Sequence, residues 1–230
     1  MTARYAIYAA PPPGSQLAAF TASWLGRDAV QDVDLPQPAV PGLPAERLSV
    51  LTAEPRRYGF HATLKPPFRL ADGYSADALD AAVATFAKGR APVALPALKL
   101  DRLGHFLALV PALRSDAVQT LAADCVMAFD AFRAPAPPAE VSRRRASGLT
   151  PAQDEYLLRW GYPYVLDEFR LHYTLTGRVT DEAEATLLER HLATVTAPLT
   201  HGATIDALCL FVQITPDAPF RVLRRYALTG

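Results

Sequence analysis

A four-residue word occurs twice in this chain of 230 residues, as His61-Ala62-Thr63-Leu64 and as His172-Tyr173-Thr174-Leu175. In an extended strand, side chains two positions apart point to the same face. Each copy therefore places an imidazole beside a hydroxyl, with apolar neighbours on the opposite face. Two such strands facing each other would form a pocket suited to acid–base chemistry at a phosphate.

The segments around the two words follow the same order in both halves of the chain. The first half predicts a strand over 4–10 that ends at Pro11, a helix over 15–25, a proline-rich loop over about 34–45, the first word, a helix over 75–89, Ala91-Pro92-Val93, and extended segments. The second half predicts a strand over 106–110, a helix over 115–132, a polar connection, the second word, a helix over 181–195, Ala197-Pro198-Leu199, and strands near 204–214 and 220–228. This duplication predicts an α+β antiparallel-sheet fold with pseudo-twofold symmetry, in which residues 1–230 form one domain of two similar lobes. The two words are then expected to face a shared central cleft.

The charge balance and the hydropathy of the chain argue against nucleic-acid and membrane partners. The chain has 23 basic and 23 acidic residues, so no net field draws it to nucleic acid or to an anionic membrane. The N-terminus lacks a basic segment followed by an apolar stretch, and polar residues interrupt every apolar run before it could span a bilayer. We therefore expect a cytoplasmic protein without a membrane partner, and we leave its oligomeric state open.

The paired words, each followed by leucine in a two-lobed α+β chain, resemble the 2H phosphoesterase superfamily. This superfamily includes RNA 2′,3′-cyclic phosphodiesterases and the 2′-5′ RNA ligase-like (LigT-like) proteins. The segments 56–68, 160–164 and 169–177 look like a bacterial branch that is encoded among phosphonate-utilisation genes. The similarity covers essentially the whole chain, including the opening Arg4-Tyr5-Ala6-Ile7-Tyr8.

The resemblance implies metal-independent hydrolysis of a small cyclic phosphodiester, without a cofactor. His61 and His172 would be the two acid–base groups, and Thr63 and Thr174 would bond the phosphate oxygens. An imidazole has an ordinary pKa of about 6.5, so one neutral and one protonated ring can coexist near neutrality. Which histidine is the base stays open. The phosphonate branch implies 5-phosphoribosyl 1,2-cyclic phosphate as the leading substrate.

Strand alternation adds two neighbours to the faces that carry the histidines. Lys65 follows His61 and Thr63 at period two, and Arg170 precedes His172. Both are candidate phosphate contacts, and the alternative for both is a solvated strand end. Tyr58 either lines the mouth of the cleft or packs against the protein, and packing is favoured for Tyr164.

The run Arg143-Arg144-Arg145 is expected in a loop before a helix that begins near Thr150. It is either a solvated surface or a clamp for a second phosphate on the substrate, because guanidinium groups bind phosphate in a forked geometry. The run is short and has no interleaved aromatic residues, so an extended nucleic-acid track is disfavoured.

No metal site is expected, because the chain has no HExxH word and the other histidines, His105, His191 and His201, stand apart. The chain also lacks a Gly-rich Walker loop and a GxGxxG fingerprint, which disfavours ATP and dinucleotides. Two alternatives to the small substrate remain. One is activity on RNA ends, as a 2′,3′-cyclic phosphodiesterase or 2′-5′ ligase-like protein. The other is a non-catalytic module that binds a phosphate ligand.

Overall fold

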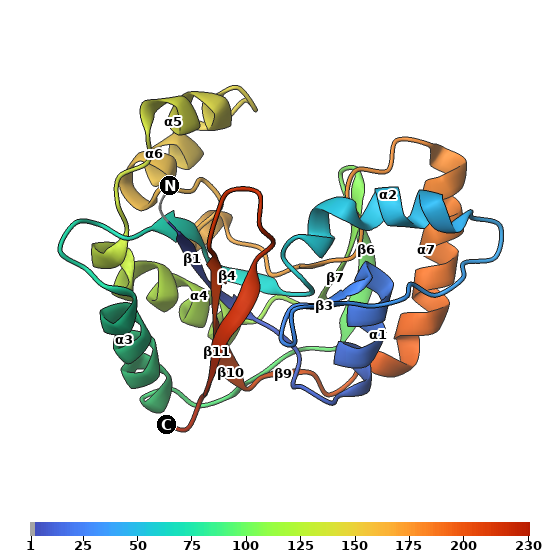
Figure 1. Cartoon of the computed structure of the whole chain (residues 1–230), viewed down its shortest axis with the longest axis horizontal. Helices are drawn as coiled ribbons and strands as arrows, with labels where there is room; N and C mark the ends of the chain where they lie inside the picture. Colours follow the sequence, from blue (N-terminus) through green and yellow to red (C-terminus); the bar gives the residue numbers. More distant parts are fainter. Residues whose placement is uncertain (1–2) are drawn as a thin grey trace.

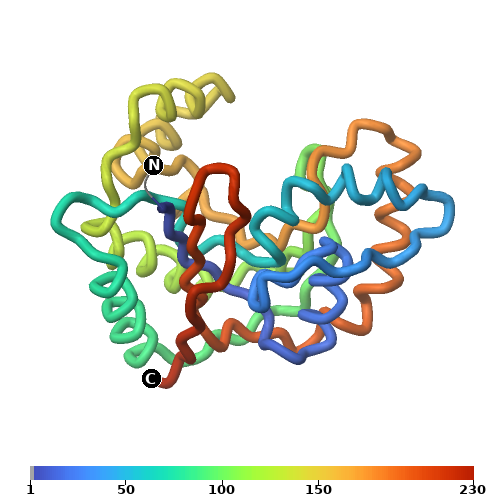
Figure 2. The backbone as a smooth tube through the Cα atoms, viewed as in Figure 1, coloured from blue at the N-terminus to red at the C-terminus, as the bar shows by residue number. Residues whose placement is uncertain are grey.

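The larger sheet is built from both ends of the chain. The computed structural model describes residues 3–230. Across this antiparallel sheet the order is β11 (Arg221–Ala227), β10 (Ala207–Gln213), β1 (Arg4–Ala9) and β4 (Ala62–Arg69). The tube in Figure 2 shows the blue start of the chain beside its red end. The first histidine word therefore enters the sheet on β4, at its edge.

The second histidine word joins a smaller antiparallel sheet. Its order is β6 (Leu98–Leu103), β7 (Phe106–Pro111) and β8 (Tyr173–Thr174). Two further antiparallel pairs are β5 (Val93–Ala94) with β9 (Thr204–Ile205), and β2 (Arg27–Asp28) with β3 (Val33–Asp34). The two halves of the chain are thus tied together at β5 and β9, one strand from each.

Each sheet mixes strands of the two repeats. The larger sheet combines β1 and β4 of the first repeat with β10 of the second, and the smaller sheet combines β7 and β8 with β6 of the first. The predicted α+β class and the repeated order of elements are confirmed. The lobes are not the two contiguous halves of the sequence, because each repeat donates its closing strand to the other sheet.

The helices lie around the two sheets (Figure 1). They are α1 (Gln16–Leu25), α2 (Ala45–Arg56), α3 (Ala76–Lys88), α4 (Asp116–Ala128), α5 (Pro138–Arg145), α6 (Pro151–Trp160) and α7 (Glu182–Thr196), with short 3₁₀ turns at Asp130–Phe132, Leu166–Glu168 and Ala197–Leu199. Helices α3 and α4 pack on the larger sheet, and α7 packs on β6. Trp24 of α1 stacks on His191 of α7, with ring centroids 5.9 Å apart. None of the helices formed by residues 3–230 is long and apolar enough to cross a membrane.

Side-chain caps explain why four helices begin where the sequence predicts. Ser15, Ser75, Ser115 and Asp181 each accept a hydrogen bond from a backbone N–H of the first turn of α1, α3, α4 and α7. Such caps satisfy donors that have no partner within the helix. The apolar spacing of these four segments supplies their buried faces, so both signals agree with the structure.

Two helices were not predicted. Helix α2 begins where the predicted proline-rich loop ends, in a stretch for which no element was predicted, and its Leu48 and Leu51 are buried in the core. Helix α5 corrects the placement of the arginine run, because Arg143, Arg144 and Arg145 lie in its last turn and not in a loop. Since α5 buries none of its residues, it has no apolar stripe for a periodicity to detect.

Candidate active site

A cleft of about 720 Å³ receives residues from both histidine words. His61 and Thr63 line it from the side of β4, and Thr174 lines it from β8. His172 lines an adjoining pocket of about 510 Å³, which shares Thr63 with the cleft. The structure therefore brings together residues that are 111 positions apart in the sequence, from two different sheets.

The two imidazoles are held in the same way. Each histidine stands immediately before its strand, and its Nδ1 lies 2.8 Å from the carbonyl oxygen of the residue two positions earlier, Gly59 for His61 and Arg170 for His172. A carbonyl only accepts hydrogen bonds, so in the neutral ring the proton is on Nδ1. The Nε2 atom of each ring is then left as the nitrogen that can exchange protons with a ligand.

The backbone at Gly59 requires glycine. Its φ is +73°, a region that other L-residues rarely adopt, and a Cβ built there would lie 2.4 Å from the Cβ of Ala29. The sequence therefore places glycine where the chain turns sharply into β4. This turn aims the Gly59 carbonyl at His61.

Aromatic rings surround His61. The Tyr8 ring stacks on it with centroids 3.9 Å apart, and Tyr58 and Phe211 lie at 5.7 and 6.1 Å. Burial among these rings lowers the pKa of His61 to about 4, an effect that the hydrogen bond to Gly59 opposes and the positive charge of His172 reinforces. His61 is therefore neutral at pH 7 and can accept a proton.

His172 has a more open environment. Its nearest aromatic neighbour is Phe106, with centroids 5.9 Å apart, and its carbonyl partner Arg170 is exposed. The two histidines therefore make equivalent hydrogen bonds to the backbone but differ in how far they are buried. Two imidazoles, together with the hydroxyls of Thr63 and Thr174, can transfer protons to and from a phosphate ester.

Lys65 does not share the face of His61 and Thr63, so that prediction is wrong. Its side chain is 1% exposed, and its Nζ donates a 2.8 Å hydrogen bond to the Val126 carbonyl of α4, with Asp130 at 3.4 Å. The pairing of β4 with β1 explains why the Lys65 side chain points to the other face. Tyr8 is opposite Thr63 and Ile7 is opposite Lys65, so Leu64 is an extra residue on β4. Such a bulge reverses the alternation that the prediction assumed. Burial lowers the pKa of Lys65 to about 8, and Asp130 opposes this effect.

Arg170 and Tyr58 lie where the sequence analysis allowed. The exposed Arg170 lines the pocket that holds His172. Tyr58 both lines the cleft and packs, because its ring stacks on Phe220 with centroids 5.0 Å apart. Packing was favoured for Tyr164, but this residue is 44% exposed and lines the same pocket as Arg170.

The three arginines of α5 have different surroundings. Arg143 and Arg144 line the cleft. Arg144 lies over the Tyr162 ring, its Cζ 4.7 Å from the centroid, and its enclosed Nε has no hydrogen-bond partner among residues 3–230. Arg144 also pairs with Glu140 at 3.3 Å. Arg145 forms a forked pair with Asp154, with N–O distances of 2.6 and 2.8 Å, and does not line the cleft. The clamp therefore stays a hypothesis for Arg143 and Arg144, and Arg145 lies outside the cleft.

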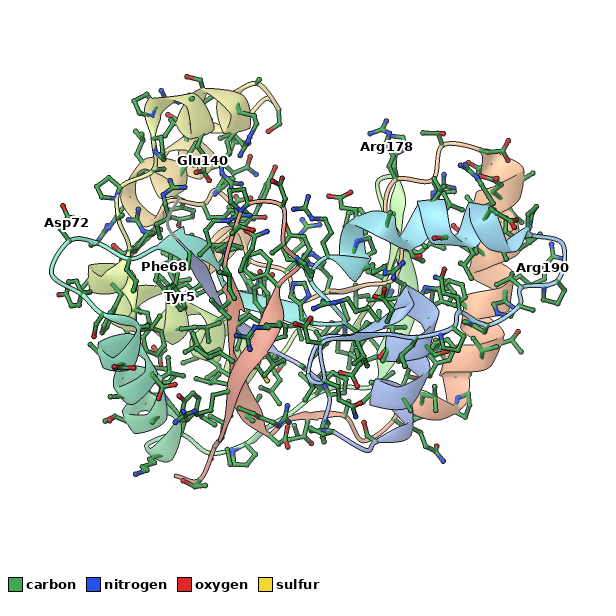
Figure 3. All side chains as sticks on the ribbon, viewed as in Figure 1. Tyr5, Phe68, Asp72, Glu140, Arg178 and Arg190 are labelled. Atoms are coloured by element: carbon green, nitrogen blue, oxygen red, sulfur yellow. The ribbon has the colours of Figure 1, made fainter. Side chains whose placement is uncertain are left out.

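Other cleft residues were missed by the sequence analysis. Besides Tyr8, they include Arg4, His105, Tyr162, Arg178 and the carboxylate of Glu54. None belongs to a histidine word or a charge run. Arg4, Tyr8 and Tyr162 lie in segments that carry the family resemblance, but nothing in the sequence assigned them to the cleft. Figure 3 shows Glu140 of α5 and Arg178 on opposite sides of the upper edge of the molecule.

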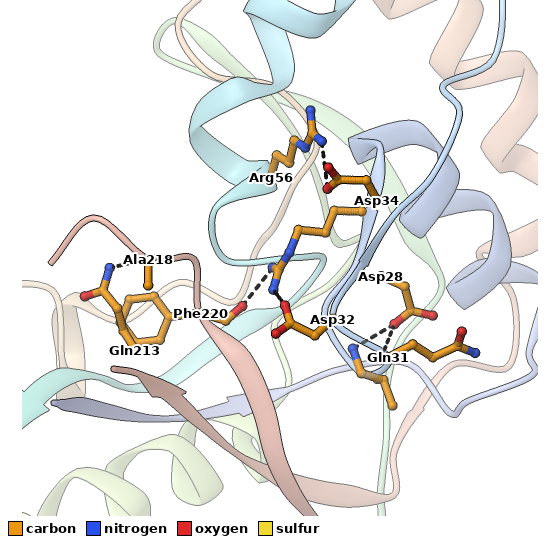
Figure 4. Close-up of polar contacts among 10 residues, drawn as sticks. Asp28, Gln31, Asp32, Asp34, Arg56, Gln213, Ala218 and Phe220 are labelled. Atoms are coloured by element: carbon orange, nitrogen blue, oxygen red, sulfur yellow. Dashed lines mark hydrogen bonds and ion pairs between the residues drawn. The ribbon is translucent and has the colours of Figure 1, made fainter. Parts of the chain in front are cut away.

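A hydrogen-bonded loop supports the aromatic wall of the cleft (Figure 4). Arg27, which is buried and paired with Asp32, donates a 2.8 Å hydrogen bond to the Phe220 carbonyl. Gln213 donates one of 2.8 Å to the Ala218 carbonyl, which closes the turn between β10 and β11. These contacts fix Phe220, on which Tyr58 stacks beside His61. Among residues 3–230 there is no group of three or more histidine, cysteine or acidic side chains that could hold a metal ion.

Comparison with known proteins gives one family match. Residues 63–221 match the model of a family described as "Protein of unknown function (DUF1045)". Two curated relatives are both called ribose 1,5-bisphosphate phosphokinase PhnN. That of Janthinobacterium sp. (strain Marseille) is 38% identical over 99% of this chain, and that of Laribacter hongkongensis (strain HLHK9) is 36% identical over 96%. The chain spans 51% of the length of each relative.

Solved structures with a similar course of the chain are more distant. The protein TT0787 of Thermus thermophilus is 13% identical with a TM-score of 0.47, and the match covers 99% of this chain and 98% of that one. E. coli LigT in complex with 3′-AMP is 15% identical with a TM-score of 0.44, and the match covers 100% of both chains.

Proposed function

The chain belongs to the DUF1045 family, described as proteins of unknown function, and from this premise we propose that it is a phosphoesterase that hydrolyses a small cyclic phosphodiester. The observation that carries the proposal is the equivalent presentation of His61 and His172, each held by its Nδ1 at 2.8 Å from a backbone carbonyl. Two equivalent imidazoles beside two threonine hydroxyls match the 2H phosphoesterase pattern. Two proton transfers by side chains need no metal.

The different environments of the two histidines support a division of roles. His61, neutral among aromatic rings, would take a proton from water as its oxygen bonds to phosphorus. His172, the more open ring, would give a proton to the ester oxygen as its bond to phosphorus breaks. The hydroxyls of Thr63 and Thr174 would donate hydrogen bonds to the nonbridging oxygens, where negative charge increases in the transition state.

The arginines favour a substrate with a second phosphate. Arg143 and Arg144 reach the cleft beside Arg4, and the Arg144 Nε lacks a partner among residues 3–230. A guanidinium group is well suited to a phosphate in a forked geometry. The leading substrate, 5-phosphoribosyl 1,2-cyclic phosphate, would place its ring phosphate between the histidines and its 5-phosphate near Arg144.

The names of the curated relatives support the same chemistry. They are called kinases of ribose 1,5-bisphosphate, and this chain matches only about half of each. This chain has no Walker loop to cradle ATP phosphates, so we assign it a step other than phosphorylation. Addition of water at phosphorus with cleavage of the bond to O2 of the ribose would yield ribose 1,5-bisphosphate. The proposed step would then supply the compound in the relatives' name, within phosphonate catabolism.

Phosphorus NMR of the purified protein with 5-phosphoribosyl 1,2-cyclic phosphate tests this proposal. We expect the cyclic phosphate signal to be replaced by that of a phosphomonoester on C1, with and without EDTA. A 2′,3′-cyclic nucleotide and a short RNA ending in a cyclic phosphate serve as competing substrates. If the ribosyl compound is not opened, it is not the substrate. If the cyclic phosphate at the RNA end is opened faster, the RNA alternative is favoured.

A further inference from the structure

Tyr8 lies beside His61 and Thr63 of the first histidine word, a position that the sequence analysis did not predict. It lies on β1 directly opposite Thr63 of β4, and its ring stacks on His61 with centroids 3.9 Å apart and planes at 26°. The residue is 1% exposed and packs with Phe211 and Phe220. It nevertheless lines the cleft. One tyrosine thus touches the histidine of the first word and neighbours its threonine.

The Tyr8 hydroxyl has no hydrogen-bond partner among residues 3–230. A buried tyrosine usually pairs its hydroxyl. Within residues 3–230, the enclosed side-chain nitrogen and oxygen atoms that lack a partner are Arg144 Nε and Trp160 Nε1. The Tyr8 hydroxyl oxygen also has no partner among these residues, but it is not one of the enclosed atoms. It is therefore accessible from outside the protein. Its hydroxyl therefore opens to the cleft, where a ligand can supply the partner.

The surroundings of Tyr8 keep its hydroxyl protonated. Burial raises its pKa well above the ordinary value, the nearby hydroxyls of Tyr58 and Tyr162 raise it further, and Arg4 opposes them. The hydroxyl therefore remains a hydrogen-bond donor over the whole working range of pH. A donor beside Thr63 faces the place where the proposed phosphate would carry its nonbridging oxygens.

We propose that Tyr8 is a substrate-contacting residue of this site, whose hydroxyl donates a hydrogen bond to a nonbridging oxygen of the substrate phosphate while its ring positions the imidazole of His61. This inference rests on the proposed function. The hydroxyl keeps its proton throughout, so His61 and His172 carry out both proton transfers. The groups that face His61 are the Tyr8 and Tyr58 rings, Phe211 and the charge of His172.

Two substitutions separate the roles of the hydroxyl and the ring. Tyr8→Phe keeps the stacked ring and removes the donor, so we expect kcat/KM for the cyclic phosphate to fall about 10- to 100-fold, as for loss of a hydrogen bond to a charged group. Tyr8→Leu also removes the ring, so the acid limb of the pH–rate profile should move upward from about pH 4. Tyr5→Phe, on the same strand but outside the cleft, is the matched control and should behave as wild type.

Each result decides one part of the inference. Wild-type kcat/KM in Tyr8→Phe, with an active wild-type protein, would overturn the hydroxyl contact and leave the proposed function standing. If the wild-type protein opens no cyclic phosphate, the proposed function fails. In that case inorganic phosphate is the probe, and an equal Kd for wild type and Tyr8→Phe would overturn the hydroxyl contact as well.

The role of the ring is tested without a substrate. Titration of the His61 C2 proton by NMR, assigned with His61→Asn, should give a pKa near 4 in the wild type and in Tyr8→Phe. In Tyr8→Leu it should rise toward the ordinary value of about 6.5. An unchanged His61 pKa in Tyr8→Leu would overturn the positioning role.

Discussion

His61 and His172 are presented to the ligand through the same contact, a hydrogen bond of 2.8 Å from Nδ1 to the carbonyl oxygen two residues earlier. The contact leaves Nε2 of both rings for chemistry. The two histidines differ in what surrounds this contact: several aromatic rings enclose His61, and the Tyr8 ring stacks on it, whereas Phe106 is the aromatic neighbour of His172.

Gly59→Ala should impair both the fold and the site. The positive φ at Gly59 and the 2.4 Å approach to Ala29 leave no room for a methyl group. We expect a loss of about 1–3 kcal/mol in the free energy of unfolding. The displaced carbonyl should also lower kcat, because the His61 ring loses its fixed orientation. Urea unfolding and steady-state kinetics measure the two effects. Gly73→Ala, also at positive φ but with nothing within 4 Å of the added Cβ, is the control and should keep full activity.

The free energy of unfolding should depend on pH through His61. Its pKa is about 4 in the folded protein, below the ordinary value of about 6.5 expected after unfolding. Between these values the unfolded chain binds more protons, so stability rises from pH 4 to 6.5 and is lost on acidification. Between pH 7 and 4 the wild type should lose roughly 1–3 kcal/mol more than His61→Asn. Equal losses in the two proteins would contradict the depressed pKa.

Arg144→Ala should weaken binding of a substrate that has a second phosphate. Loss of a charge-assisted contact predicts a KM about 10- to 100-fold higher for 5-phosphoribosyl 1,2-cyclic phosphate. Ribose 1,2-cyclic phosphate, which lacks the 5-phosphate, should show no such change. Arg145→Ala is the matched control, because Arg145 is paired with Asp154 outside the cleft. An equal rise in KM for both substrates would place Arg144 at the ring phosphate instead.

Lys65→Met should leave catalysis nearly unchanged. The Lys65 ammonium bonds α4 and does not line the cleft, so kcat/KM should stay within about twofold. Asp130 keeps its 2.8 Å contact with Arg133, so no carboxylate is left without a partner. The buried Val126 carbonyl loses the donor that Lys65 supplies, so we expect the free energy of unfolding to fall by about 1–3 kcal/mol. A tenfold rise in KM would instead return Lys65 to the phosphate site.

The sequence predicted the parts of the fold that depend on local patterns. Apolar spacing and caps gave α1, α3, α4 and α7, and the period of two in the histidine words placed His61 and Thr63 on one side of the cleft. Two helices, α2 and α5, were not predicted, also for local reasons. Helix α5 has no apolar stripe, and α2 lies among prolines that favour a loop.

The rest depended on contacts between distant segments. Lys65 was misplaced because the bulge at Leu64 arises from the register of β4 against β1, which no pattern within β4 encodes. Tyr8 was read as part of a strand, and only its pairing with Thr63 reveals its place beside His61. For the same reason the exchange of closing strands between the two sheets could not be inferred from the repeated order of elements.

The central claim is that the imidazoles of His61 and His172 transfer the protons when water opens a cyclic phosphate. Phosphorus NMR of ring opening by the variants His61→Asn and His172→Asn tests it most directly. Asparagine can keep the donor that bonds the Gly59 or Arg170 carbonyl but lacks the Nε2 base. We predict folded variants whose kcat falls about 10²- to 10⁴-fold, as expected when a general acid or base is lost. Ring opening at the wild-type rate by either folded variant would contradict the account.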